Sequence, residues 1–337
     1  MQKRILILTT KSSGKGGTET VIKAWQAKYP TVYLAEWTQP ALTWGDPARS
    51  IVLRGNTLAK LQQMHKFIIE HEIDVVLATG PTLILLAKLA ALGSKRIKIG
   101  SWIHFSLDMP YITTLKKQFL RLADFHLAIA SAIEAQLVAV GIKPTKIHTI
   151  YNPIQRQTQT IQPSATATLE LVYVGRVMLA GQKNLRELFA GLAQLTLPWH
   201  LRIFGADAKD VPDVVAELER LQISQNVEFA GWHANPWAHI QTADGLVLTS
   251  TYEGFPLVLC EAISYGLPVV ASQTKTGTDD IVVPGVNGYM YASGAPAQLA
   301  ANLAKLHAQQ FDPATIKKSL EPYYADRYFA NIDTLFD

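Results

Sequence analysis

Cysteine is almost absent from this sequence, which contains only Cys260. A single thiol excludes an internal disulfide framework, so we expect a reducing compartment and a buried, non-catalytic Cys260. Long apolar runs are also missing. The longest, residues 83–92, is interrupted by Lys88 and is far shorter than the roughly 20 residues of a spanning helix. The apolar run near Met1 is too short for a signal peptide, and we therefore expect a cytoplasmic protein, soluble or peripheral.

Several motifs of other protein classes are absent as well. The glycine-rich segment KSSGKGGTET (11–20) has Glu19 where the dinucleotide fingerprint needs its third glycine, and it lacks the Gly-Lys-Ser/Thr ending of a P-loop. No Asp-x-Asp dyad and no His/Cys ligand cluster occur, and the adjacent pair Asp279-Asp280 is a poor substitute, so no metal and no cofactor are predicted. Dispersed basic residues without an RNA-binding motif disfavour nucleic acid as a partner.

Length and charge indicate two domains with different partners. At about 100–200 residues per domain, 337 residues suit two domains, and a hydrophobic content of 48% suffices for two cores. Residues 1–160 carry 20 Lys+Arg and 9 Asp+Glu, a charge of +11, which leaves 11 basic and 18 acidic residues of the chain's 31 and 27, a charge of −7. We expect the first half to meet an anionic partner.

Short apolar runs alternate with longer helical patterns, as is typical of a doubly wound α/β protein. The expected strands are residues 5–8, 75–78, 97–102, 126–130, 147–150, 169–174, 200–204, 227–229, 246–249 and 269–272. A polar stretch at 152–168 shows neither the helical nor the strand repeat of apolar residues and is expected to be a linker. Two Rossmann-like domains facing a central cleft are predicted, at 1–160 and 161–318, followed by a terminal helix at 319–337.

Residues 244–272, DGLVLTSTYEGFPLVLCEAISYGLPVVAS, form the stretch around which the chain is organised. It predicts a buried strand, a turn, a helix that starts at Pro256, and a second strand. The turn follows a parallel strand, where open α/β sheets bind ligands. The amides of Phe255, Leu257 and Val258 form an anion site at the helix start, while carboxylates nearby suit hydroxyl groups. The stretch therefore predicts a nucleotide-sugar site.

The segment Glu253-Gly254-Phe255-Pro256, with Glu261 and a following Ala-x-x-x-Gly-x-Pro, resembles the retaining glycosyltransferases of family 4, which have the GT-B fold. The resemblance implies that Glu253 binds hydroxyls of the donor sugar and that Glu261 binds those of the ribose. It also implies that the terminal helix crosses back towards the first domain. The alternative is an ordinary βαβ unit with two surface acids.

Arg176 and Lys183 follow a predicted strand in LVYVGRVMLAGQKNL (171–185). An arginine fork and a lysine point charge suit a diphosphate, and the spacing resembles the family's Gly-Arg…Lys-Asn element. The alternative, which stays open, is that both residues are exposed surface charges that bind no ligand. The resemblance implies that these cations stabilise the leaving diphosphate without a metal, and retention of anomeric configuration also rests on it alone.

His104 in SWIHFSLD matches the family's first-domain histidine that contacts the donor sugar, although a structural histidine is the alternative. Gly16 and Gly17 resemble its N-terminal glycine loop near the donor phosphate and the acceptor, where a plain tight turn is equally open. Gly231 and Trp232 match the region that borders the nucleoside, but Trp232 and Trp237 could instead be core residues.

Residues 111–123 place Leu115, Phe119 and Leu122 on one helix face and Lys116, Lys117 and Arg121 towards another. Two interpretations remain open: a solvated helix, or contact with an anionic membrane surface or a lipid-linked acceptor.

A closer likeness involves HFSLD, ADFHLAIAS, the NP of residues 152–153, YVGRVMLAGQKN and VLTSTYEGFP. These segments resemble the α-1,6-galactosyltransferases that use UDP-galactose in lipopolysaccharide core synthesis. The likeness implies a UDP-galactose or UDP-glucose donor, but no matched residue dictates the acceptor. We separately expect a glycan or lipid-linked acceptor and a place at the inner face of the cytoplasmic membrane. A catalytically silent paralogue or partner subunit, and a UDP-sugar epimerase of the same fold, are the alternatives.

Overall fold

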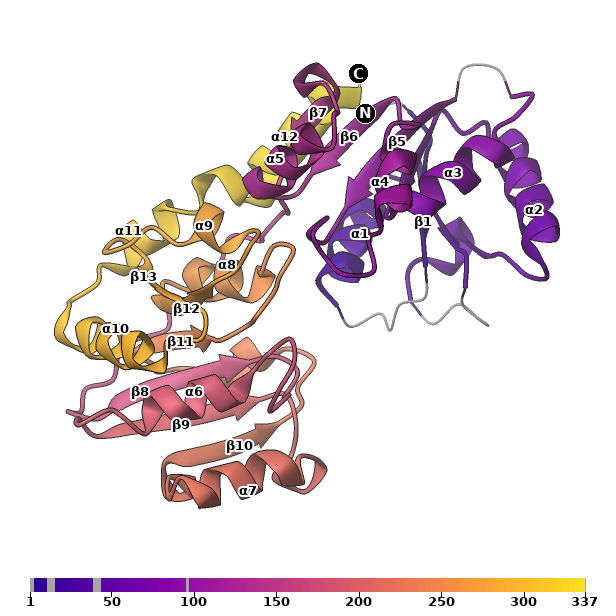
Figure 1. Ribbon diagram of the computed structural model, residues 1–337. Helices are drawn as coiled ribbons and strands as arrows, with labels where there is room; N and C mark the ends of the chain where they lie inside the picture. The colour runs from indigo at the N-terminus through magenta and orange to yellow at the C-terminus, as the bar shows by residue number, and fades with distance from the viewer. Residues whose placement is uncertain (1–2, 11–15, 39–43, 95–96, 337) are drawn as a thin grey trace. The chain divides into compact units, whose positions relative to one another are not determined.

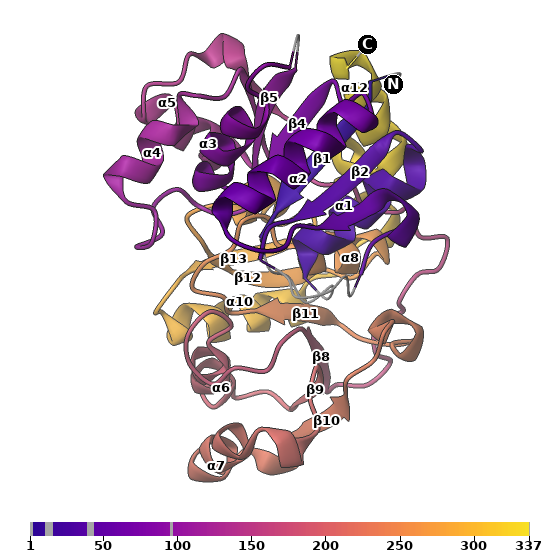
Figure 2. The same ribbon diagram turned by 90° about the vertical axis from the view of Figure 1, so that its right-hand side faces the viewer.

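The structure, a computed structural model, describes residues 3–10, 16–38, 44–94 and 97–336. The chain forms two compact units: unit 1 contains residues 1–153 and 326–337, and unit 2 contains residues 154–325. Each unit is built on one parallel β-sheet with helices packed against it (Figure 1, Figure 2). The predicted α/β class is therefore confirmed for both halves of the chain.

The sheet of unit 1 has the strand order β3-β2-β1-β4-β5-β6-β7. Its strands are β1 (Ile5–Thr9), β2 (Val32–Glu36), β3 (Ser50–Val52), β4 (Val75–Ala78), β5 (Lys98–Ile103), β6 (Phe125–Ala128) and β7 (Ile147–Thr149). Its helices are α1 (Gly17–Lys28), α2 (Thr57–Glu70), α3 (Pro81–Ala90), α4 (Thr114–Leu120), α5 (Ser131–Ala139) and α12 (Ala325–Phe336).

The last helix, α12, completes the core of unit 1. The indole N–H of Trp25 on α1 donates to the hydroxyl of Tyr328 at 2.9 Å, and the ring of Phe125 contacts that of Phe336 edge-on. Tyr328 and Phe336 are buried. Unit 1 therefore needs residues from both ends of the chain.

The sheet of unit 2 has the strand order β10-β9-β8-β11-β12-β13. Its strands are β8 (Leu169–Val174), β9 (Trp199–Phe204), β10 (Val227–Gly231), β11 (Gly245–Leu248), β12 (Val269–Gln273) and β13 (Gly288–Ala292). Its helices are α6 (Leu185–Leu192), α7 (Pro212–Arg220), α8 (Leu257–Ser264), α9 (Thr278–Ile281), α10 (Pro296–Ala308) and α11 (Pro313–Lys318).

Helix α6 shows why these residues pack as they do. Leu185, Leu188, Phe189 and Leu192 recur at helical spacing on one face, and all four are buried in the core of unit 2. Gly191 lies against α10, where a Cβ would come within 2.7 Å of Leu299. The two helices therefore approach closely over the sheet.

All ten predicted strands are present, with bounds within two residues of those expected. The strands β2, β3 and β13 were not predicted. β3 is only half-buried, and β13 begins at Gly288, where a Cβ would lie 2.0 Å from the carbonyl oxygen of Val269. In a sequence, glycine at this position indicates a loop rather than the start of a strand. In the folded sheet, however, only glycine fits there.

Most of the stretch expected as a linker is instead part of unit 2. Nζ of Lys317 donates to the carbonyls of Gln157 (3.1 Å) and Gln159 (2.6 Å), and Ile161 is buried with its amide on the carbonyl of Tyr265. The functional domain bounds at 1–160, 161–318 and 319–337 stay a prediction.

Both sheets reverse their order beside the first strand, between β1 and β4 in unit 1 and between β8 and β11 in unit 2. Open α/β sheets bind ligands at this switch point, next to the carboxyl ends of the strands. In unit 2 the two loops at that edge are residues 175–184, after β8, and residues 249–256, after β11. These are the switch-point loops.

Candidate active site

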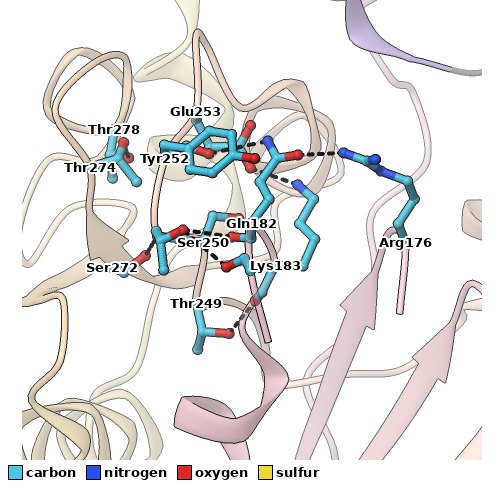
Figure 3. A network of polar contacts seen from close by, with 12 residues as sticks. Arg176, Gln182, Lys183, Thr249, Ser250, Tyr252, Glu253, Ser272, Thr274 and Thr278 are labelled. Carbon is cyan, nitrogen blue, oxygen red and sulfur yellow. Dashed lines mark hydrogen bonds and ion pairs between the residues drawn. The ribbon is translucent and has the colours of Figure 1, made fainter. Parts of the chain in front are cut away.

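Lys183 and Glu253 form an ion pair between the two switch-point loops (Figure 3). Nζ of Lys183 lies 2.6 Å from Oε1 of Glu253, and the side chains are 13% and 11% exposed. Little water screens such a pair, so it is stronger than an ion pair on the surface. Two predicted site residues, far apart in the sequence, are thus in direct contact.

Arg176 is tied to the same loops through Gln182. Nη2 of Arg176 donates to Oε1 of Gln182, whose Nε2 donates to the carbonyl of Tyr252 at 3.2 Å. Figure 3 shows the guanidinium directed towards Gln182 and the ammonium of Lys183 towards Glu253. The hydroxyl of Tyr173 donates to the carbonyl of Arg176 at 2.7 Å, and burial raises the pKa of Tyr173 so that it stays a donor.

Main-chain hydrogen bonds fix the two loops against each other. The amide of Thr251 donates to the carbonyl of Gln182 at 2.8 Å, and the buried hydroxyl of Thr249 donates to the carbonyl of Lys183 at 3.0 Å. Asn184 has a left-handed backbone (φ +48°) and donates its side-chain amide to Glu187. These bonds fix the backbone at Gln182 and Lys183, from which the Lys183 side chain reaches Glu253 and the Gln182 side chain reaches Arg176.

Helix α8 starts one residue later than predicted, because Pro256 is its N-cap rather than its first residue. The amides of Leu257 and Val258 belong to the first turn, where a helix offers no internal acceptor. The helix dipole adds positive potential at this end. The geometry thus provides an anion-binding end beside Glu253.

The loop after β12 packs on the Gly254-Phe255 turn. Gly277 has φ +84°, and a Cβ there would lie 2.7 Å from the carbonyl oxygen of Gly254 and 2.8 Å from Cα of Phe255. The hydroxyl of Thr276 donates to the carbonyl of Glu253. Glycine at 277 therefore allows the loop to support the turn that carries Glu253.

Glu261 begins the second turn of α8 and is held by a tryptophan from another element. Nε1 of Trp237, on the short 3₁₀ helix η5 (Pro236–His239), donates to Oε2 of Glu261 at 3.0 Å. Burial raises the pKa of Glu261, and the hydrogen bond from Trp237 opposes that rise. The carboxylate is thereby fixed in one orientation.

Strands β8, β9 and β10 end close together at glycines. A Cβ on Gly205 would lie 1.9 Å from the carbonyl oxygen of Gly175, and the amide of Gly205 donates to the carbonyl of Gly231 at 2.8 Å. The next residue, Trp232, is 59% exposed, so the core interpretation is wrong for Trp232, whereas Trp237 is buried.

The remaining predicted site residues lie in unit 1. His104 follows β5, packs on Trp102 and has no hydrogen-bond partner for Nε2 in the part of the chain that the structure describes. Burial lowers the pKa of His104 to about 3, so its imidazole is neutral. Gly16 is the N-cap of α1, and Gly17 is its first residue. Their contribution to a site with the unit 2 residues stays a prediction.

Part of the glycine-rich segment, residues 11–15, lies outside the described residues. Within the described ranges, no group of three or more His, Cys, Asp or Glu side chains could hold a metal ion. Cys260 is buried, as expected, and burial raises the pKa of its thiol.

Sequence reasoning missed two residues of this site. Gln182, which links Arg176 to the second loop, adjoins Lys183 in the sequence, and that proximity was the available signal. Trp237 was assigned only a core role, and nothing in its sequence neighbourhood indicates its bond to Glu261.

Two family models match the chain: "Glycosyltransferase Family 4" over residues 35–157 and "Glycosyl transferases group 1" over residues 155–320. Two similar proteins are lipopolysaccharide 1,6-galactosyltransferases. The one from Salmonella typhimurium is 36% identical over 248 residues, which cover 71% of this chain and 67% of that protein. The one from Escherichia coli K12 is 32% identical over 279 residues, which cover 80% and 76%.

Solved structures give a further likeness. The apo form of the lipopolysaccharide outer core galactosyltransferase WaaB has a TM-score of 0.85 and 29% identity, with 98% of each chain covered. Anabaena HepE in complex with UDP and glucose has a TM-score of 0.78 and 18% identity, with 99% of each chain covered, a likeness of fold alone.

Proposed function

Because this chain belongs to glycosyltransferase family 4 and has the GT-B fold, we propose that it is a retaining hexosyltransferase acting in bacterial cell-envelope polysaccharide synthesis. It moves galactose or glucose from a UDP-hexose to a glycan or lipid-linked acceptor. The observation that carries the proposal is the near-buried Lys183–Glu253 pair, with Arg176 tied to the same two loops, at the binding edge of unit 2. The names of the two similar galactosyltransferases support the choice of sugar and acceptor class.

The cations act on the leaving group. Arg176, Lys183 and the first-turn amides of α8 hold the donor diphosphate and stabilise the charge that it gains as the sugar leaves. Oε1 of Glu253 is bonded to Lys183, and we assign Oε2 to a hydroxyl of the transferred sugar. The ion pair thus holds the sugar-binding carboxylate beside the diphosphate site.

The other assignments follow the family resemblance. Glu261 accepts the ribose hydroxyls, and Gly231 and Trp232 border the base, in keeping with their positions at the carboxyl edge of the sheet. His104 contacts the donor sugar, and its neutral imidazole can donate or accept a hydrogen bond. Unit 1 provides the acceptor side and unit 2 the nucleotide-sugar side.

The test is a screen of UDP-galactose, UDP-glucose and UDP-N-acetylglucosamine with and without glycan acceptors, read by UDP release and by mass spectrometry of the product. We expect acceptor-dependent transfer that falls about 100-fold in Arg176→Met, since one stabilising donor to the leaving group is lost. Unchanged turnover in a folded Arg176→Met protein would contradict the assignment. UDP release without a glycan product would favour the silent paralogue, and interconversion of UDP-hexoses without acceptor would favour an epimerase.

Transfer is proposed to need no metal, because the protein's own cations face the diphosphate. Turnover should then be unchanged by EDTA. A loss with EDTA that Mg²⁺ or Mn²⁺ restores would contradict this part of the proposal.

A surface of unit 1 suits the anionic membrane partner. Leu89 of α3 and Leu92 just after it are exposed, as are Leu115 of α4 and Leu122, so part of the predicted apolar helix face is in solvent. The helices α3 and α4 pack on each other. We call these leucines, with the neighbouring Lys88, Lys116, Lys117 and Arg121, the α3–α4 surface. Among the described residues no helix is long and apolar enough to cross a bilayer.

Vesicle binding tests this surface. Leu115→Glu should reduce sedimentation with phosphatidylglycerol vesicles and leave binding to neutral vesicles at its low level. Leu58→Glu on α2 is the matched control, because Leu58 is 64% exposed against 66% for Leu115. Equal binding of both variants would exclude the α3–α4 surface. We propose that this surface holds the protein at the inner face of the cytoplasmic membrane, and binding that requires anionic lipid would support this.

A further inference from the structure

We propose that Trp237 makes the site selective for ribonucleotide donors, by holding the carboxylate of Glu261 in the orientation that accepts the ribose hydroxyls. This inference rests on the proposed function, in which Glu261 is the ribose ligand. Trp237 is then a positioning residue that acts through Glu261.

The geometry fixes one carboxylate oxygen and leaves the other for ligand. The indole N–H of Trp237 donates to Oε2 of Glu261 at 3.0 Å. The terminal torsion of a glutamate is otherwise broad, so a single fixed donor removes most of its freedom. Oε1 and the second lone pair of Oε2 remain as acceptors. The two neighbouring hydroxyls of a ribose can each donate a hydrogen bond to one of these acceptors.

Trp237 itself is held rigidly. Its ring is buried and stacks on Tyr265, with centroids 5.4 Å apart and planes 22° apart. Tyr265 lies one helical turn after Glu261, so the same face of the α8 segment supports both the indole and its acceptor. The indole cannot leave the carboxylate without losing that stacking contact.

The element that carries Trp237 is independent of α8. β10 ends at Gly231, whose left-handed backbone (φ +77°) turns the chain, and Nε2 of His233 contacts the carbonyl of Ala230 at 2.8 Å. The 3₁₀ helix η5 follows, with Pro236 at its first turn. The loop after β10 and the helix after β11 are therefore joined through the Trp237–Glu261 bond.

The bond also favours the charged form of Glu261. Burial disfavours the carboxylate, and the donated N–H from Trp237 opposes it. Two titratable groups of the same segment lie near Glu261: Cys260 in α8 and Tyr265 at its C-cap. Burial raises the pKa of both, and the charge of Glu261 adds a smaller rise. On η5, the ring of His239 contacts that of His233 instead, with the two planes tilted by 41°. Trp237 thus helps to keep Glu261 an acceptor of two hydroxyls rather than a protonated acid.

The experiment compares UDP with 2′,3′-dideoxy-UDP by calorimetry on the full chain. Wild type should prefer UDP, and Trp237→Phe should lose about 10-fold in UDP affinity, the value of one hydrogen bond to a charged group, with less than about 2-fold loss for the dideoxy analogue. Affinity for UDP falls as Glu261 is protonated, and Trp237→Phe should move that fall to higher pH. Equal loss for both nucleotides, or an unmoved pH profile, would overturn the inference.

Two further variants separate this inference from the proposed function. Trp199→Phe removes another buried indole of unit 2, in the core at β9, and should leave both affinities unchanged. Glu261→Gln should lower UDP affinity whatever Trp237 does. If Glu261→Gln has no effect, the ribose assignment fails. If it has an effect while Trp237→Phe keeps full selectivity, only the role of Trp237 fails.

Discussion

We expect the Lys183–Glu253 ion pair to stabilise unit 2 in addition to its proposed role in the site. Lys183→Met would leave a carboxylate that is only 11% exposed without its cation. We expect the free energy of unfolding to fall by about 3 kcal/mol, because an almost buried charge loses its partner. Urea denaturation of the variant and the wild type measures the difference.

A surface ion pair provides the control. Nζ of Lys88 lies 3.0 Å from Asp124, with side chains 35% and 43% exposed, so Lys88→Met should cost about 0–1 kcal/mol. The double variant Lys183→Met/Glu253→Gln should recover part of the loss, since no unpaired charge remains. Similar losses in Lys183→Met and Lys88→Met would contradict this account of the site pair.

His126 makes the stability of unit 1 depend on pH. Its ring is buried, with Nδ1 2.7 Å from the hydroxyl of Ser101, and burial lowers its pKa from 6.5 to about 4, with a smaller contribution from Lys146. Between these two pH values the unfolded chain binds a proton that the native state does not. The contribution of His126 to the free energy of unfolding is therefore complete above pH 6.5. It falls by about 3 kcal/mol as the pH drops to about 4.

The variant His126→Asn tests this directly, because asparagine can keep a hydrogen bond to Ser101 without titrating. The difference between its unfolding free energy and that of the wild type should change across pH 4–6.5 and stay constant above pH 7. A constant difference throughout would mean that His126 does not titrate on unfolding.

At the scale of elements, the loop after β12 supports the turn before α8. In Gly277→Ala the new Cβ would meet the carbonyl of Gly254 at 2.7 Å and Cα of Phe255 at 2.8 Å, both backbone atoms, so the turn must move. We expect hexosyl transfer to fall by at least about 10-fold, because Glu253 moves with the turn. Initial rates at saturating donor measure the effect.

Gly285 supplies the matched control. Its φ of +78° is close to the +84° of Gly277, but a Cβ there meets nothing within 4 Å. Gly285→Ala therefore also places a side chain at positive φ, at a cost of about 1 kcal/mol, without the collision. Comparable loss of transfer in both variants would show that strain, rather than displacement of the turn, is responsible.

The strands could largely be predicted because a parallel strand is buried on both faces. Runs such as Ile5–Leu8 and Val269–Ser272 are apolar for that reason, and their bounds were right to within two residues. β13 was missed because the close approach to Val269 that requires Gly288 is a property of the folded sheet. No local pattern contains it.

The same limit applies to the site. Arg176, Lys183 and Glu253 were predicted because each follows a strand, and the Lys183–Glu253 contact comes from the strand order β8-β11. That Gln182 orients Arg176 and that Trp237 reaches Glu261 depends on which loops meet, and a single sequence does not specify this. Whether the unit 1 residues His104, Gly16 and Gly17 join them stays a prediction.

At the scale of the whole molecule, unit 2 is one continuous segment with its own sheet and core. We expect the fragment 154–325 to fold alone and to bind UDP, because the proposed diphosphate and ribose ligands of unit 2 all lie within it. It should show no transfer, since it lacks unit 1, the proposed acceptor side. Circular dichroism, urea denaturation and calorimetry with UDP test these points.

Unit 1 provides the contrasting case. The fragment 1–153 lacks α12, so Trp25 would lose the hydroxyl of Tyr328, and Phe125 would lose the ring of Phe336. We expect it to unfold non-cooperatively or to aggregate, and the addition of 326–336 through a flexible linker should restore a cooperative transition. A stable fragment 1–153 without that helix would contradict the role assigned to α12.

The return of α12 to unit 1 also determines when each half of a nascent chain can reach its native state. Unit 2 leaves the ribosome second, yet every residue of its core is available once residue 325 has emerged. Unit 1 emerges first but must wait with the Trp25 side of its core uncovered until Tyr328 and Phe336 have been translated. The half made first is therefore the half completed last, and during this interval the apolar side of unit 1 that α12 covers is open to other contacts.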